Sequence, residues 1–348
     1  MKMIKPSYKI YNIPDATDHD AVLMHLERIG RTCYKSEDRI TSDSCIKFIE
    51  NIRNLKHWAI LEHYIFTISV SSQIYFSIVE LLSDRTIRNP DILMKIGYIR
   101  ATRWDEADDE YRYLISFSAT AINNLIQCPE FKNDPDFGLV DIYMFMCKHY
   151  PELMVQSDDI IKPSIIDKNI KFLTRKEIRL LPNWLRDIHD FMSVLFVVDR
   201  GITHEIVRHR PASFAQESTR YCNYSKFKFG NEITVIIPSC FDNGMSDDLN
   251  TKLFDVWKKS CENSMDDYLK LLEMGATAQE ARSVLPTSIK ADLIMTANIY
   301  EFKHFFNMRC DKPAHPQMRE VACPLLIEAN ESNEYKHLFD DQIHLVNK

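Results

Sequence analysis

The sequence predicts an α+β protein, a mostly antiparallel sheet flanked by helices and carrying a large mixed insertion. Runs typical of strands occur at four places, 64–70, 191–198, 233–237 and 293–297, with amphipathic helical segments around them. The chain has 348 residues, of which 45% are apolar, so it can bury a sizeable core. With seven glycines it shows neither a dinucleotide-binding nor a phosphate-loop fingerprint.

The N-terminal part predicts two helices and a strand. The first helix covers 19–33, with Asp18 and Asp20 as capping candidates. The second follows Thr41 and Ser42, and its apolar residues recur on one face as far as Leu55. Residues 61–70 are typical of a strand in which apolar side chains alternate with Thr67 and Ser69.

Residues 71–188 carry no chemical motif, and we interpret them as an insertion lobe. They predict a strand at 113–117 and helices at 119–127 and 139–149, joined by polar or proline-marked connections at 105–110, 129–135 and 157–167. The carboxylates between Asp105 and Glu110 lack a glycine to shape a cation loop, which favours a solvated loop over a metal site.

The C-terminal part returns to clear patterns. A buried strand at 191–198 leads into a short helix over 202–206, which Pro211 ends. After the strand at 233–237, a long helix is expected from an N-cap at Ser246 to Gly275, with its apolar side running from Leu249 to Leu272. A capping box at Thr277 and Glu280 starts the next helix, and helices at 299–308 and 314–330 follow the last strand, the second interrupted by Pro324.

Charge and cysteine content limit the class of protein. The net charge of −7 provides no general attraction to nucleic acid or anionic membranes, so neither is expected as a partner. Nine scattered cysteines without metal-ligand spacing are typical of free thiols in a reducing compartment, which predicts a cytoplasmic protein. The N-terminus lacks the apolar core of a signal peptide, and no apolar run is long enough to cross a membrane.

The densest chemistry lies between His204 and Tyr221. His204 and Glu205 resemble the start of a zinc-protease helix, but that site needs histidines four residues apart on one helix face. The second histidine here, His209, is five residues on, and Arg208 occupies the position of the missing ligand. We therefore expect no metal at this segment.

Two arginines beside His209 fit an anion site better. Guanidinium groups bind phosphate in a bidentate manner and stay charged at any working pH, although Arg208 and Arg210 are equally compatible with a solvated basic helix end. The segment after Pro211 favours the anion site, because it adds hydroxyl, amide and guanidinium donors on a glycine-free loop: Ser213, Gln216, Ser218, Thr219 and Arg220.

These residues resemble the signature of the flavin-dependent thymidylate synthases, an arginine-histidine-arginine followed at fixed spacing by serine, serine and arginine. Further segments are similar to that family in the same order: Arg31 to Tyr34, Leu61 to His63, Ala281 to Pro286, and Asn298 to Arg309 followed by His315 and Gln317. The resemblance covers roughly 20–70 and 190–330. It implies a catalytic flavin- and nucleotide-binding domain formed by 1–70 and 189–348, with 71–188 as the inserted lobe.

The resemblance implies reductive methylation of dUMP to dTMP, with methylenetetrahydrofolate as carbon donor, FAD as hydride carrier and NADPH as reductant. No cysteine nucleophile is needed, and Cys222 is interpreted as structural. The implied catalytic residues are Ser218, Arg220 and Arg309, and the implied dUMP-binding residues are Gln216, Ser218, Arg220, Arg282 and Arg309. The implied flavin contacts are His63, Arg208, His209, Arg210, Asn298 and Asn307. Enzymes of this family are homotetramers whose sites draw on several subunits.

Two positions depart from the family pattern, and two alternative functions stay open. Glu205 stands where a glutamine is common, and Cys33 stands where a serine or threonine is frequent. One alternative is a nucleotide- or RNA-binding protein that uses Arg208, Arg210 and Arg220 without catalysis. Another is a member that kept the fold and lost activity.

Overall fold

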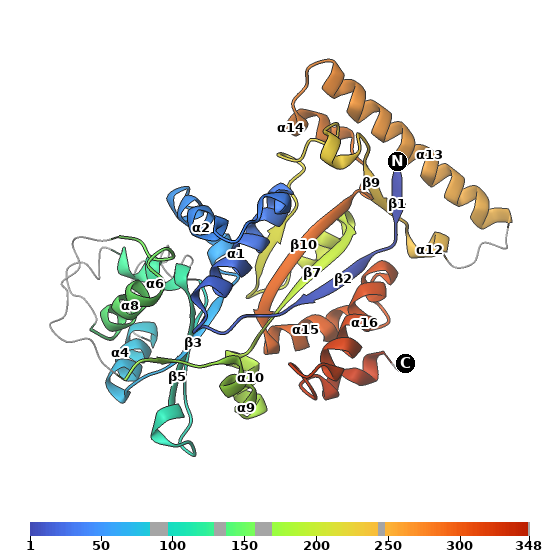
Figure 1. Cartoon of the computed structure of the whole chain (residues 1–348). Coiled ribbons are helices and arrows are strands. Elements are labelled where there is room, and N and C mark those ends of the chain that lie inside the picture. Colours follow the sequence, from blue (N-terminus) through green and yellow to red (C-terminus); the bar gives the residue numbers. More distant parts are fainter. Residues whose placement is uncertain (84–96, 129–136, 157–168, 243–247, 347–348) are drawn as a thin grey trace.

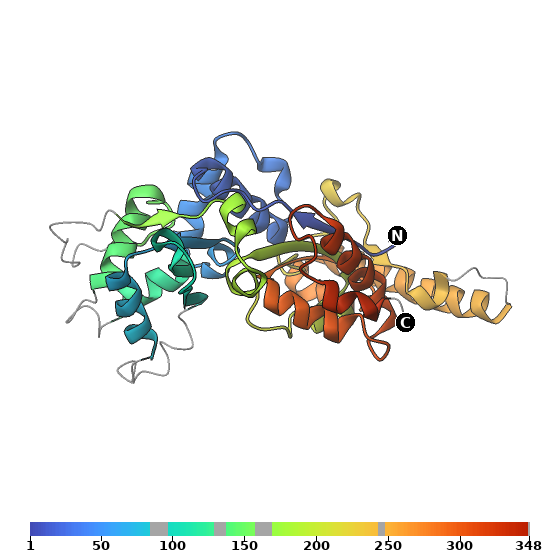
Figure 2. The ribbon, with the colours of Figure 1, turned by 90° about the horizontal axis from the view of Figure 1, so that it is seen from below.

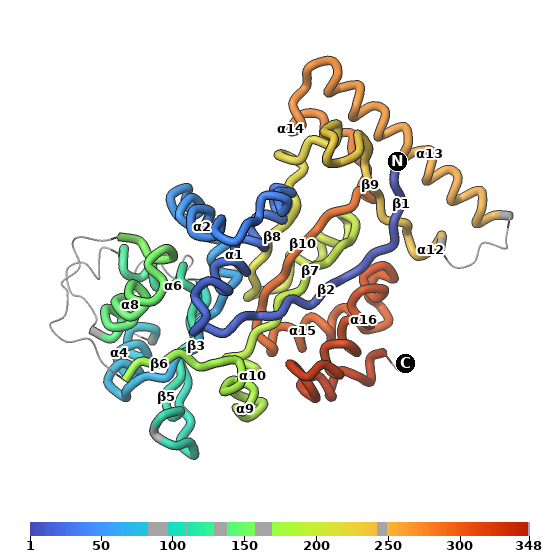
Figure 3. The backbone as a smooth tube through the Cα atoms, viewed as in Figure 1, coloured from blue at the N-terminus to red at the C-terminus, as the bar shows by residue number. Residues whose placement is uncertain are grey.

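A central sheet with helices on both faces joins a lobe on one side to a projecting helix on the other (Figures 1 and 3). The computed structural model describes residues 1–83, 97–128, 137–156, 169–242 and 248–346. Its helices and mostly antiparallel strands confirm the α+β class. None of the described helices is long and apolar enough to cross a membrane.

The central sheet has four antiparallel strands in the order β2-β7-β10-β8, namely β2 (Ser7–Tyr11), β7 (Phe191–Asp199), β10 (Lys290–Asn298) and β8 (Ser213–Gln216). The expected strands at 191–198 and 293–297 pair along their whole length, from Lys290 opposite Asp199 to Asn298 opposite Phe191. We did not anticipate β2 or β8. Strand β8 lies at an edge of this sheet.

Each face of the central sheet belongs to a different hydrophobic cluster. Ile294 and Ala215 pack with α1 (His19–Tyr34) and α2 (Ser44–Asn54), whereas Leu293 and Met295 pack with α15 (Ile299–Arg309) and α16 (Pro316–Glu331). This is the alternation that a two-residue strand repeat imposes when both faces are covered.

The lobe has its own sheet, in the order β4-β5-β3-β6, with β4 (Ile99–Arg103), β5 (Tyr113–Ser118), β3 (Ile65–Ser69) and β6 (Lys171–Phe172). The prediction that the strand near 64–70 lies in one sheet with the strands at 191–198 and 293–297 is therefore wrong. The expected alternation is also absent, because Thr67 and Ser69 are buried like their apolar neighbours. The Thr67 hydroxyl is hydrogen-bonded to Ser116 Oγ at 2.7 Å, which satisfies it away from water.

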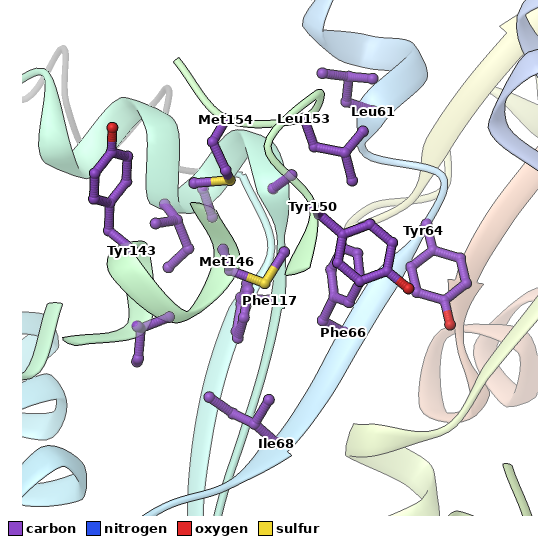
Figure 4. Close-up of a cluster of buried hydrophobic side chains, with 14 of the residues drawn as sticks. Leu61, Tyr64, Phe66, Ile68, Phe117, Tyr143, Met146, Tyr150, Leu153 and Met154 are labelled. Carbon is purple, nitrogen blue, oxygen red and sulfur yellow. The ribbon is translucent and has the colours of Figure 1, made fainter. Parts of the chain in front are cut away.

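Aromatic side chains pack with leucine, isoleucine and methionine side chains in the core of this lobe (Figure 4). Phe66 of β3 lies between the rings of Tyr150 and Phe117, at centroid distances of 4.8 and 6.0 Å. The hydroxyl of Tyr150 donates to the carbonyl of Ala16 at 2.6 Å, which ties the lobe to the segment before α1. The division of the chain at 70/71 and 188/189 remains a prediction, and the pairing of β3 with β5 joins residues on either side of its first boundary.

The strand expected at 233–237 also lies outside the central sheet. It is β9 (Thr234–Ile236), which pairs in parallel with β1 (Lys2–Ile4) in a separate two-stranded sheet. The sequence offered no sign of this pairing, because β1 is only three residues long.

The remaining helices surround these sheets. They are α3 (Trp58–Leu61), α4 (Ser72–Ser83), α6 (Ala119–Ile126), α8 (Phe137–His149), α9 (Arg175–Leu180), α10 (Asn183–His189), α11 (Arg200–Ile206), α12 (Ser239–Asp242), α13 (Asp248–Glu273) and α14 (Ala278–Ala281). Short 3-10 turns complete the set at Glu37–Arg39, Asp109–Tyr111, Phe227–Phe229, Arg282–Val284 and Asp340–Leu345. The helices expected around 119–127 and 139–149 are confirmed as α6 and α8.

Several capping predictions are confirmed. Asp18 accepts from the backbone of Ala21, the capping box of Thr277 and Glu280 is complete, and Gly275 adopts φ 98° after α13. The expected N-cap Ser246 lies outside the described residues. The predicted interruption at Pro324 is wrong, because α16 runs through that residue.

Helix α13 is buried mainly along its second half. Cys261 and Tyr268 are buried, but Leu249, Leu253 and Val256 are 61%, 47% and 71% exposed, so the first half of the expected apolar side is not covered by the described residues. The helix projects from the body in both perpendicular views (Figures 1 and 2).

Candidate functional site

The arginine-histidine-arginine segment lies between α11 and β8. Asp199, the last residue of β7, caps α11 by accepting from the backbone of Ile202 at 2.9 Å. The chain then turns through Arg210 and Pro211, joined by a cis peptide bond, into β8. We expected a loop after Pro211, and this is wrong for residues 213–216, because they pair with β10 from Thr296 to Leu293.

The side chains of Arg309, Glu205 and His209 form one hydrogen-bonded group. Arg309 donates to a Glu205 carboxylate oxygen at 2.6 Å, to the Glu205 backbone carbonyl at 3.0 Å and to His209 Nε2 at 2.9 Å. These contacts bring the end of α15 against the end of α11. Glu205, noted above as a departure from the family pattern, is therefore the residue that holds the Arg309 guanidinium.

The hydrogen bond from Arg309 defines the tautomer of His209. Burial, together with the charges of Arg309 and neighbouring His304, lowers the pKa of His209 to about 4, so the ring is neutral near pH 7. The Arg309 Nε group can only donate, so His209 Nε2 accepts and Nδ1 carries the proton. That Nδ1 atom is buried and has no partner among the described residues. It is a donor that a bound ligand's oxygen could satisfy.

His63 forms a second group at the other side of β10. Its Nδ1 is 2.7 Å from Thr296 Oγ1, which is 2.8 Å from Ser193 Oγ, and the ring is fully buried. Burial, with a smaller contribution from His25, lowers the pKa of His63 to about 3. Its Nε2 is also a buried atom without a partner in the described part of the chain.

These two groups lie on opposite faces of the central sheet. Thr296, which holds His63, is on the face of Ile294 and α1, whereas Arg309 and His209 belong to the face covered by α15. The amide of Gln216 donates to Thr203 of α11 at 2.8 Å, so Gln216 is on the second side. One chain therefore does not bring all the expected flavin contacts into one cavity.

Ser218 and Arg220 follow the far end of β8. The Ser218 amide donates to the Cys33 carbonyl at 3.0 Å, and the rings of Tyr34 and Tyr221 are 5.6 Å apart, so the N-terminal segment of the resemblance does contact the central motif. The Arg220 guanidinium donates to Gln279 of α14 at 2.5 Å.

Of the other expected residues, Asn298 has a structural role, and four have side chains without a partner among the described residues. Asn298 caps α15 by accepting from the backbone of Glu301 at 2.9 Å, and its amide donates to Tyr98 Oη at 3.1 Å. Four expected residues are exposed, and their side chains make no hydrogen bond or ion pair with the described residues: Arg208, Arg210, Arg282 and Asn307. They are free to bind a ligand, but the fold does not orient them.

A pocket of about 720 Å³ lies where β7 begins and β10 ends. Arg210, Pro211 and Ser213 form one part of its lining, and residues 58, 59, 62 and 65 beside His63 form another. Its aromatic residues are Trp58, Tyr98, Phe191 and Phe214. The volume is in the range of small-molecule sites, and the aromatic lining suits a planar heterocycle such as a flavin.

Sequence reasoning missed three parts of this region. His304, rather than Asn307, lies beside the ring of His209, at 5.6 Å between centroids. Tyr98 and Arg100 of the lobe line the pocket, although no motif marks them. Buried Glu217 contacts Lys290 at 2.5 Å, and Lys290 and Lys35 both bind Asp292, so this ion-pair network fastens the motif to α1 and β10.

Neither thiol chemistry at Cys222 nor metal binding is suggested by the described side chains. Burial raises the pKa of Cys222 to about 12, which keeps it a thiol. Among the described residues, no group of three or more histidine, cysteine, aspartate or glutamate side chains is placed to hold a metal ion.

Comparisons with known proteins agree with the resemblance in the C-terminal half. Residues 176–332 match the family described as thymidylate synthase complementing protein. A flavin-dependent thymidylate synthase of Pyrococcus abyssi is 32% identical over 137 residues, which are 39% of this chain and 53% of that protein. A protein of the same name from Saccharolobus solfataricus is 29% identical over 177 residues, 47% of this chain and 61% of that protein. The chain thus spans about half the length of the curated relatives it matches.

Solved structures give weaker similarities. A UMP/dUMP methylase from Streptomyces cacaoi bound with 5-Br UMP is 22% identical, covers 49% of this chain and 82% of its own, and has a TM-score of 0.39. Thymidylate Synthase X from Helicobacter pylori, with FAD and dUMP, is 21% identical over 44% of this chain and 73% of its own, with a TM-score of 0.33. Similarities of this size say nothing about function.

The family match covers the central motif, β10 and α15, and thus Arg309, His209 and Glu205, but does not reach the segments at 31–34 and 61–63. Within residues 176–332 this chain is therefore similar to the thymidylate synthase complementing protein family.

Proposed function

We propose that this protein is a flavin-dependent thymidylate synthase that methylates dUMP to dTMP, with methylenetetrahydrofolate as carbon donor and NADPH as reductant. The observation that supports this most directly is the group formed by Arg309, Glu205 and His209. It places a fixed guanidinium beside a buried, unpartnered imidazole N–H, within the segment that matches the family.

The residues present fit a flavin. The aromatic residues of the 720 Å³ pocket offer a surface for a flat ring, and Arg210 in the same lining offers a cation. His209 Nδ1 and His63 Nε2, which have no partner among the described residues, are buried outside this pocket. We propose His63, Arg208, His209, Arg210, Asn298 and Asn307 as FAD contacts. Bound FAD would supply the hydride that completes the methyl group, so the protein needs no cysteine nucleophile.

The nucleotide is assigned to the second half of the motif. Ser218 and Arg220 follow the edge strand β8 and would bind the phosphate and pyrimidine of dUMP. Arg282, which is exposed and directly follows α14, would bind the same nucleotide. Arg309 would place its guanidinium at the polar edge of the uracil. Positive charge held there stabilises negative charge as it develops on the ring, which is catalysis by preorganised electrostatics.

We further propose that the protein works as a homotetramer. The expected flavin contacts lie on both faces of the central sheet, so a second copy is needed to bring such contacts into a shared site. The exposed apolar side of α13 provides a surface that another copy could cover.

The decisive experiment uses the purified full chain. We expect absorbance bands at about 375 and 450 nm from oxidised flavin, followed by dUMP-dependent NADPH oxidation and dTMP formation. A colourless protein that FAD cannot reconstitute would contradict the proposal. Flavin binding without dTMP formation would instead indicate a family member that has lost activity.

Arg220→Ala tests the nucleotide assignment. The substitution removes the guanidinium that now binds Gln279, and we expect turnover with dUMP to fall at least tenfold. Gln279→Ala removes the same contact and leaves the arginine, so it is the matched control. Undiminished turnover in Arg220→Ala would remove Arg220 from the catalytic residues.

A further inference from the structure

The lobe contributes residues to the same pocket as the arginine-histidine-arginine motif. Five of the pocket's lining residues come from the lobe: Gly97, Tyr98, Arg100, Thr120 and Asn124. Arg210, Ser213 and Phe214 line the same pocket. Ser213 and Phe214 belong to β8 of the central sheet, whereas β4 belongs to the lobe sheet. The pocket is therefore a junction between the two sheets.

Tyr98 is held firmly at this junction. Its hydroxyl donates to the Ile188 carbonyl at 2.6 Å and accepts from Asn298 at 3.1 Å, and its ring meets Phe191 edge-on at 4.9 Å. The three partners belong to α10, β10 and β7, all outside the lobe sheet. Tyr98 therefore fixes the position of β4 relative to the end of the central sheet.

Gly97 allows the chain to reach this position. It has φ 77°, and a Cβ atom there would lie 3.2 Å from Ser118 Oγ and 3.6 Å from the backbone nitrogen of Ala121. A side chain would meet both unfavourable backbone geometry and the start of α6. The close approach places the next residues, including Arg100, at the edge of the pocket.

Arg100 presents a cation at this edge. Its guanidinium lies over the Tyr98 ring at 5.1 Å and donates to its own strand at the Ile99 carbonyl, 2.7 Å away. It is exposed and forms no ion pair within 4 Å with the described residues. Stacking on a fixed ring orients a guanidinium while leaving several of its N–H groups available.

The same pocket holds a second cation and one carboxyl group. Arg210 is exposed and has no partner within the described residues, and Glu62 is largely buried, which raises the pKa of its carboxyl group. A lining that contains two arginines and four aromatic residues suits a planar heterocycle that carries an anionic tail.

We propose that Arg100 and Arg210 together bind the phosphate groups of a flavin nucleotide whose ring contacts the aromatic residues of this pocket. The inference rests on the proposed function and assigns a role to the lobe: β4 supplies a ligand-binding arginine, and Tyr98 is the residue that positions it.

Equilibrium titration of the full chain with FAD, FMN and riboflavin, followed by flavin fluorescence, tests the proposal. For Arg100→Gln we expect roughly tenfold or weaker binding of FAD and FMN, because a charge-assisted contact to phosphate is lost. Riboflavin, which has no phosphate, should bind wild type and variant equally. Arg100→Lys should keep part of the affinity, since it retains the charge without the planar fork.

Arg103→Gln is the matched control, because Arg103 is exposed on the same strand and pairs with Asp105. It should leave all three affinities unchanged. Equal FAD affinities for wild type and Arg100→Gln would overturn the inference. An equal loss for FAD and riboflavin would also overturn it, because Arg100 would then act on the ring and not on the phosphate.

The two proposals can fail separately. If wild type makes dTMP and Arg100→Gln binds FAD normally, the role of the lobe is wrong and the enzyme assignment stands. If wild type binds no flavin, the enzyme assignment is wrong, and titration with ADP then tests whether Arg100 and Arg210 bind phosphate groups. Binding of ADP that Arg100→Gln weakens would support that site, and no difference would overturn it.

Discussion

At the scale of single residues, the central finding is how Arg309 is held. Glu205 accepts from it through both the carboxylate and the backbone carbonyl, and His209 accepts at Nε2. Sequence comparison marked Glu205 only as a departure from the family pattern. The structure gives that departure a role, because a carboxylate two residues after Thr203 on α11 can reach the end of α15.

We expect Glu205→Ala to lower kcat/KM for dUMP by about tenfold, because Arg309 loses its charge-assisted hydrogen bond and is less well oriented. Glu205→Gln keeps an acceptor oxygen and should stay within about threefold of wild type. Steady-state kinetics with dUMP varied at saturating NADPH and folate measures both. Glu331→Ala, an exposed glutamate at the end of α16, is the control. Equal kinetics for Glu205→Ala and wild type would show that Glu205 does not position Arg309.

At the scale of elements, the lobe sheet and the entry to β7 are joined by one buried histidine. His189 is hydrogen-bonded to Ser116 Oγ of β5 and to Thr102 Oγ1 of β4, both at 2.7 Å, and its carbonyl accepts from Thr67 of β3. One residue at the end of α10 thus contacts three strands of the lobe sheet. No sequence pattern indicated this, because a lone histidine has no periodicity.

This arrangement predicts an acid-sensitive fold. Burial lowers the pKa of His189 to about 3, so between pH 6.5 and that value the unfolded chain binds a proton that the folded chain does not. Stability therefore falls as pH decreases, by about 2 kcal/mol between pH 7 and pH 5 for this residue. Buried His63, whose pKa burial also lowers to about 3, acts in the same direction.

Chemical unfolding at pH 7, 6 and 5 measures the effect. His189→Gln should be less stable than wild type at pH 7, because it loses a hydrogen bond to Ser116 or Thr102, but it should lose about 2 kcal/mol less on going to pH 5. His57→Gln, at an exposed histidine, should keep the wild-type pH dependence. Parallel pH profiles for wild type and His189→Gln would rule out His189 as a source of acid sensitivity.

At the scale of the whole molecule, one side of α13 exposes a row of apolar side chains. Leu249, Leu253 and Val256 share one side of α13 at spacings of four and three residues and are all exposed. The helix projects beyond the other helices (Figure 2), and these three side chains are left exposed by the described residues. Exposed apolar side chains arranged this way commonly mark an interface.

We expect Val256→Glu to shift the protein to smaller species in light scattering after size exclusion, because a carboxylate would be buried without a partner in a homotetramer interface. Thr251→Glu places the same group on the opposite side of α13 and should leave the mass unchanged. If wild type is a monomer, or Val256→Glu keeps the wild-type mass, this side of α13 is not the interface. Thermal unfolding of both variants confirms that they are folded.

The amino-acid sequence by itself determined the local structure and the chemistry. Helix α1 and its Asp18 cap, the capping box at Thr277 and the paired strands at 191–198 and 293–297 follow from periodicity and from side chains that bond to the neighbouring backbone. The central motif followed from its unusual density of donors. Each of these signals is contained within about twenty residues of chain.

Only the tertiary structure decided which segments meet. The strand at 65–69 joined the lobe sheet, residues 213–216 became an edge strand, and Tyr98 and Arg100 entered the pocket. Strand pairing depends on backbone groups that all residues share, and on which buried faces fit together over long separations. For that reason the sequence predicted candidate residues for the site, whereas the fold set their division between two faces of one sheet.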